Sequence, residues 1–76
     1  MTQSYKIRLE AVHLELANAH VYLDGTRISD GKPVRCPLNP QMFTFPEGSD
    51  IISDMQILAD GFKQRIGQEI NIIQES

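Results

Sequence analysis

The chain has 76 residues, 41% of them apolar and 22% charged, and its seven basic and ten acidic residues leave a net charge of −3. This length and composition predict a single folded domain over residues 1–76 and exclude a disordered segment. Because Lys and Arg are few and scattered, the sequence lacks the concentrated positive charge that carries the affinity of most nucleic-acid binders, and we expect no nucleic-acid partner.

The first expected element is a strand over residues 5–16, "YKIRLEAVHLEL". Apolar and polar residues alternate as far as Leu9, and the apolar frame then slips by one residue before alternation resumes at Val12. Period-2 alternation with one slip is typical of a half-buried strand that contains a β-bulge. A helix is the alternative, because Leu, Glu and Ala favour helices, but a helix would divide these apolar residues between two faces.

Two Asp-Gly pairs follow, at Asp24-Gly25 and Asp30-Gly31. The first pair suits the type I′ turn of a β-hairpin, whose two central residues need positive φ, and the second then indicates an excursion at the sheet edge. Prolines punctuate the next segment, and because proline lacks the ladder N–H, they restrict it to edge strands and loops. Between Pro40 and Pro46, the sequence "QMFTF" predicts a short strand.

The clearest element is a helix over residues 50–66. Ser49 is placed to cap its N-terminus, and Gly67 is placed as the C′ residue that ends it. Asp50 in the first turn and Lys63 in the last turn complement the helix dipole. One arc of about 120° is filled by apolar residues at helical spacing. These residues are Ile51, Ile52, Met55, Leu58, Ala59, Phe62 and Ile66.

The last expected element is a closing strand in "QEINIIQ", where Ile70 and Ile72 alternate with Glu69 and Asn71. The whole chain is therefore predicted to be an α+β domain of the order β-β-(β)-β-α-β. Its sheet is mostly antiparallel, and one amphipathic helix packs on one face. If "QMFTF" and "EINII" are parallel neighbours, the helix between them makes a right-handed β-α-β connection.

The sequence offers little catalytic chemistry. Cys36 is the single cysteine, so it forms no internal disulfide, and we expect it to act as a small buried hydrophobe. A nucleophilic role with His13 or His20 is the alternative, and it needs folding to bring an imidazole to the thiol. The spacing of these three residues fits no zinc motif, and no phosphate-binding or hydrolase motif is present. We expect no metal, no cofactor and no enzymatic activity.

One surface of the helix departs from its pattern. Ile57 lies almost opposite the apolar arc, among polar residues that include Asp54 and Gln64, and Gly61 follows one turn later on the same side. A mid-helix glycine costs about 0.5–1 kcal/mol relative to alanine, and it permits close approach of another backbone. An isolated exposed isoleucine is common, so the alternative to a contact surface is that Ile57 has no role.

No motif is specific to one family; in size and style the chain is similar to many accessory proteins, including viral inhibitors of host systems. We expect a non-enzymatic interaction module that self-associates as a homodimer and binds or inhibits a protein partner. Ile57, Gly61, Asp54 and Gln64 are the predicted interface residues. A second copy is a natural remedy for a small domain, which buries only about 60% of its unfolded surface.

The alternative function is binding of a small anionic ligand or nucleotide in a pocket at a subunit interface. We expect the loop 30–48 to contribute to this pocket together with Arg35, Tyr22 and His20, because the arginine fork suits carboxylates and phosphates. The polar start "MTQSYKIRLE" does not resemble a signal peptide, and no apolar run approaches about 20 residues. We therefore expect no membrane association and a cytoplasmic location, in a cell or in a host cell if the protein is viral.

Overall fold

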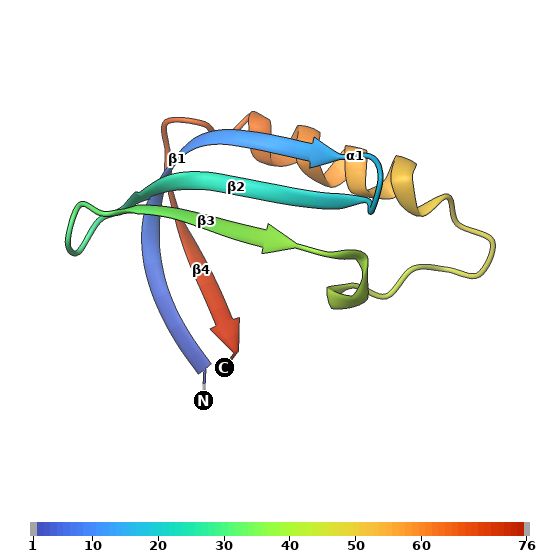
Figure 1. The fold of residues 1–76 in the computed structure, drawn as a ribbon, viewed down its shortest axis with the longest axis horizontal. Helices are drawn as coiled ribbons and strands as arrows, with labels where there is room; N and C mark the ends of the chain where they lie inside the picture. The colour runs from blue at the N-terminus through green and yellow to red at the C-terminus, as the bar shows by residue number, and fades with distance from the viewer. Residues whose placement is uncertain (1, 76) are drawn as a thin grey trace.

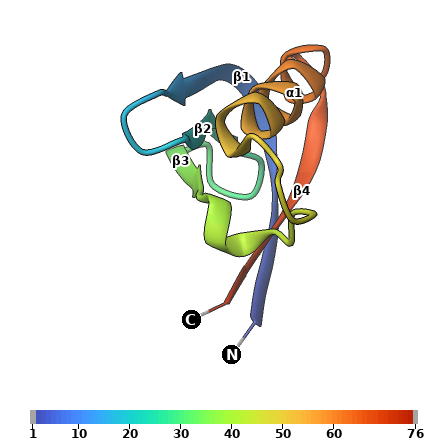
Figure 2. The ribbon, with the colours of Figure 1, turned by 90° about the vertical axis from the view of Figure 1, so that its right-hand side faces the viewer.

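Residues 2–75, which the computed structural model describes, form a four-stranded antiparallel sheet and one α-helix that packs against one face of the sheet (Figures 1 and 2). In chain order the elements are β1 (Thr2–Glu15), β2 (His20–Arg27), β3 (Pro33–Leu38), the 3₁₀ turn η1 (Pro40–Met42), α1 (Ile51–Lys63) and β4 (Glu69–Glu75). The strands lie in the order β3-β2-β1-β4. The predicted α+β class is confirmed. In this part of the chain no helix is long and apolar enough to cross a membrane.

Strand β1 bends and pairs with two neighbouring strands. Its first half pairs with β4, from Thr2 to Arg8, whereas residues 7–15 pair with β2. The register shifts between Leu9 and Ala11, which confirms the predicted bulge. Figure 1 shows the start of β1 and the end of β4 leaving the main sheet together as a two-stranded arm. We call residues 2–6 and 71–75 the β1–β4 ribbon. The radius of gyration is 12.9 Å, above the value of about 11 Å for a compact chain of this length.

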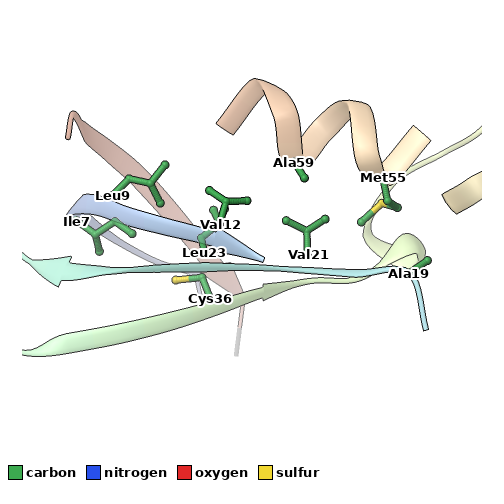
Figure 3. Packing of buried hydrophobic residues seen from close by; sticks show 9 residues of the cluster. All are labelled: Ile7, Leu9, Val12, Ala19, Val21, Leu23, Cys36, Met55 and Ala59. Atoms are coloured by element: carbon green, nitrogen blue, oxygen red, sulfur yellow. The ribbon is translucent and has the colours of Figure 1, made fainter. Parts of the chain in front are cut away.

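The core lies between the sheet and the middle of α1 (Figure 3). The sheet contributes Ile7, Leu9, Val12, Val21, Leu23 and Cys36, the β1–β2 turn contributes Ala19, and α1 contributes Met55 and Ala59. The predicted apolar arc of the helix is too wide, because Ile51, Ile52 and Ile66 are 42–46% exposed. The helix therefore buries only a narrow stripe.

The first Asp-Gly pair is not a turn, so that prediction is wrong. Asp24 and Gly25 lie inside β2, and the hairpin turns at residues 16–19, where Ala19 has φ 55°. Gly25 is needed for a different reason: a Cβ at this position would clash with the carbonyl oxygen of Arg8 on the neighbouring strand. The glycine therefore allows β1 and β2 to approach closely beside the bulge.

The second Asp-Gly pair does lie in a turn, the one that joins β2 to β3. There the Asp30 Oδ1 atom accepts a hydrogen bond from the Lys32 N–H at 3.1 Å. The strand predicted for "QMFTF" is wrong, because Pro40–Met42 form η1 and residues 43–50, all described, form no strand. The β-α-β connection therefore does not form, and β4 instead pairs antiparallel with β1.

The ends of α1 differ from the predicted ones by one to three residues. Asp50, not Ser49, is the N-cap, because its Oδ1 atom accepts a hydrogen bond from the Ser53 N–H at 3.3 Å. The helix ends at Lys63, and Gln64 rather than Gly67 closes it. Gly67 instead begins the return to the sheet, since its N–H donates to the Leu9 carbonyl at 2.7 Å.

Candidate functional site

The outer side of α1 carries the four predicted interface residues. Asp54, Ile57, Gly61 and Gln64 follow one another at helical spacing on the side away from Met55, and the Ile57 side chain is 69% exposed. A Cβ at Gly61 would meet nothing within 4 Å in the described chain. The protein's own fold therefore requires neither an isoleucine at position 57 nor a glycine at position 61. Their role in an interface stays a prediction.

The sheet face away from α1 carries a polar cluster that includes the alternative ligand residues. Alternation along the paired strands places His20, Tyr22 and Arg35 on this face. The Arg35 guanidinium carbon lies 5.5 Å from the centre of the Tyr22 ring, and the His20 Nδ1 atom lies 3.3 Å from the Tyr22 hydroxyl oxygen. The structure thus brings these three residues together. Residues 33–38 of the predicted loop 30–48 form strand β3 instead, and Pro37 of this strand pairs with Tyr22.

The arginine of this cluster already holds a carboxylate. Arg35 donates from Nε to Asp24 Oδ1 at 2.7 Å and from Nη2 to Asp24 Oδ2 at 3.1 Å, and His13 Nε2 lies 3.1 Å from Oδ2. These hydrogen bonds, chiefly those from Arg35, hold the pKa of Asp24 below its ordinary value despite partial burial, and Asp24 in turn raises the pKa of Arg35. An anion that binds Arg35 must therefore compete with Asp24.

A groove of about 610 Å³ lies between the two edge strands. Its lining comes from Tyr5, Leu23, Arg35, Cys36, Pro37, Leu38, Met42, Phe62, Asn71, Ile72 and Ile73. Both β3 and β4 contribute, so the sheet is curled and its two edges approach the same hollow. The Tyr5 hydroxyl oxygen lies 3.4 Å from the Cys36 sulfur, which joins the β1–β4 ribbon to β3 across the groove.

Cys36 is buried, as expected, and its neighbour is a phenol rather than an imidazole. The hydrogen bond with Cys36 and burial together raise the pKa of Tyr5, and the charge of Arg27, 5.1 Å from the ring centre, acts in the opposite direction. His13 and His20 lie on the opposite face of the sheet. A histidine-activated thiol, the alternative reading of Cys36, is therefore not assembled. Within residues 2–75, no group of three His, Cys, Asp or Glu side chains is arranged to hold a metal ion.

The outer edge of β4 is an open strand edge. The sequence alone indicates that sheet edges are exposed but not that β4 carries one of them. Leu9 donates its N–H to Gln68 and accepts from Gly67, so its backbone groups turn toward β4. Alternation along β1 then directs the polar groups of Ile7 and Tyr5 to their partners Ile70 and Ile72. The N–H and C=O groups of Glu69, Asn71 and Ile73 consequently point outward. Among the described residues no strand pairs with this edge.

The fold and its surfaces define the chain as a small α+β domain with an open, curled antiparallel sheet and one covering helix. No protein-family model, no curated protein and no solved structure matches it. The surfaces that stand out are the outer side of α1, the polar cluster, the groove and the outer edge of β4.

Proposed function

We propose that this protein is a non-enzymatic interaction module that self-associates as a homodimer and binds or inhibits a protein partner. The observation that carries the proposal is apolar surface that its own core does not use, above all Ile57, 69% exposed beside the open Gly61 position. The total accessible surface is 5414 Å², about 700 Å² more than expected for a folded chain of 8.6 kDa. A standard protein interface covers about 800 Å² on each partner, so the excess is comparable in size to one side of such an interface.

The chemistry of the polar groups supports a binding role over a catalytic one. The thiol of Cys36 faces a phenol with a raised pKa, which is a poor base near neutral pH. The best-formed charged cluster, that of Asp24 and Arg35, is satisfied internally. We place this module in the cytoplasm, in a cell or in the host cell of a virus, where an accessory protein would meet its partner.

The substitution Ile57→Lys tests the partner surface. It adds a charge to the centre of the outer side of α1 without disturbing Met55 or Ala59, so the melting temperature should change little. Gln56→Lys is the matched control, because Gln56 is equally a helical, exposed residue but lies about 100° away around α1. Affinity capture followed by mass spectrometry should recover a partner with wild type and the control, and recover much less with Ile57→Lys. Equal recovery with all three proteins would refute this role.

A second candidate is binding of a small anion or nucleotide, because the structure places Arg35, Tyr22 and His20 in contact. Thermal-shift measurements with phosphate, ADP and citrate test this function. If it is correct, a ligand that stabilises wild type should stabilise Arg35→Ala less. Asp24→Asn should bind it more tightly, since the variant no longer competes for the guanidinium with a charged carboxylate. No stabilisation of wild type by any of the three anions would contradict this candidate.

A further inference from the structure

We propose that a second copy of this chain docks on the outer edge of β4, with the two β4 strands antiparallel about a two-fold axis at Asn71. The two sheets then join into one eight-stranded sheet. This inference rests on the self-association in the proposed function and names its surface, its partner and its register. The outer side of α1 is left for the other protein partner.

The two edges of the sheet differ in what they offer to another strand. Arg27 donates its N–H to Lys32 across the β2–β3 pair, so alternation directs the outward positions of β3 to Pro33, Arg35 and Pro37. Two of these three residues have no N–H, and prolines of this kind block strand addition. The corresponding outward residues of β4, which are Glu69, Asn71 and Ile73, all carry one. β4 is therefore the edge that accepts a strand.

Backbone pairing and hydrophobicity select the register. An axis at Ile72 would set two residues opposite each other whose N–H and C=O groups already turn toward Tyr5, so the central pair would make no backbone hydrogen bond. An axis at Asn71 centres a residue whose groups point outward. It sets Asn71 opposite its own equivalent, Ile70 opposite Ile72, and Glu69 opposite Ile73. Both backbone bonds of the central pair are then made by outward groups.

In the same register, β4 of the second copy extends the lining of the groove beyond the edge of the single chain. Ile72 faces the groove, and Asn71 and Ile73 lie along its rim on the outer edge of β4. In the proposed dimer, Ile70 of the second copy stands beside Ile72 on the groove side. The half-buried isoleucines of both β4 strands then form a continuous apolar row. Ile73, which is 71% exposed in the single chain, then lies next to a strand of the second copy.

The test uses opposite charges at the two-fold axis. Asn71 is exposed, so Asn71→Lys and Asn71→Asp should fold normally, which circular dichroism checks. In either variant alone, two like charges meet in the dimer, and we expect the dimer dissociation constant to rise about tenfold at low ionic strength. An equimolar mixture pairs opposite charges and should recover the wild-type mass in analytical ultracentrifugation. Ser4→Lys is the control and should remain dimeric, because Ser4 lies on β1, the strand that pairs with the inner side of β4.

Each result supports or overturns a specific step. Loss of dimer in both variants with recovery in the mixture establishes Asn71 at the axis. Ile73→Lys checks the register: it should preserve the dimer, since it faces Glu69 of the second copy, whereas an axis at Ile73 would make it dissociate. A wild-type dimer unaffected by both Asn71 variants overturns the β4 interface but leaves self-association standing. A wild-type protein that stays monomeric at every concentration overturns both the interface and the self-association.

Discussion

Gly61→Ala should stabilise the isolated protein and weaken its binding to a partner. Gly61 lies in the last turn and a half of α1 with ordinary helical geometry, and a Cβ there would meet nothing within 4 Å of the described chain. The methyl group therefore causes no clash and restricts the unfolded chain. Replacing glycine by alanine in an exposed helix gains about 0.5–1 kcal/mol. For a domain of this size, 1 kcal/mol corresponds to about 4–8 °C, so the melting temperature should rise by about 2–8 °C.

The measurement is differential scanning calorimetry at one fixed low protein concentration, with urea unfolding at 25 °C as a second probe. Gly48→Ala is the matched contrast, because a Cβ at that position also meets nothing within 4 Å. Its φ of 83°, however, lies in the left-handed region, where alanine costs about 1–2 kcal/mol. One substitution should therefore raise the melting temperature and the other should lower it, although neither creates a contact.

Partner binding supplies the second readout. If another backbone approaches the outer side of α1 at Gly61, the added methyl group should reduce affinity about tenfold or more while stability rises. A variant that is more stable and binds equally well would show that Gly61 lowers the stability of the helix without contributing to binding. A variant that is less stable would refute the structural reasoning itself, because it would mean that the space around Gly61 is occupied.

Two further predictions concern the sheet. Gly25→Ala should destabilise the protein by about 1–3 kcal/mol, because the new Cβ would collide with the Arg8 carbonyl oxygen and force β1 and β2 apart; an unchanged melting temperature would contradict this. Asp24→Asn should reduce the acid sensitivity of folding. The pKa of Asp24 is lower in the folded than in the unfolded chain, so its contribution is present above about pH 4 and lost as the pH falls through the folded pKa. Urea unfolding from pH 7 to pH 2 should thus show a steeper loss for wild type than for the variant, and parallel curves would refute the effect.

The elements that local patterns specify were predictable. The alternation of residues 5–16 and its slip identified β1 and its bulge, because side-chain period and burial are properties of one strand. The Asp24-Gly25 turn failed for the opposite reason. The pair has the composition of a hairpin turn, but the chain uses Gly25 for its lack of a side chain against Arg8, a contact 17 residues distant in sequence. A local turn preference does not reveal such a close approach between strands.

Some candidate surfaces could likewise be predicted from local patterns, and others could not. The exposure of Ile57 followed from the helical wheel alone. The groove and the outer edge of β4 could not be predicted from the sequence. They depend on how β1 bends between β2 and β4, and on which backbone groups are hydrogen-bonded in each strand pair. The contact between Tyr5 and Cys36, 31 residues apart, illustrates this dependence. The alternation of Ile70 and Ile72 with polar residues indicated a strand, but a pattern within seven residues does not show that the outer edge of this strand lacks a partner.

The two proposed interfaces lie on different elements, and this separation makes their coupling informative. Figure 1 shows α1 over the main sheet and the free ends of the β1–β4 ribbon pointing away from it. Effects at well-separated sites without shared partners usually add. A double variant with Ile57→Lys and Asn71→Asp should therefore lose partner binding and self-association to the extents measured singly. If partner binding also falls in Asn71→Asp alone, the partner must recognise the dimer, and the second copy is then part of the binding surface.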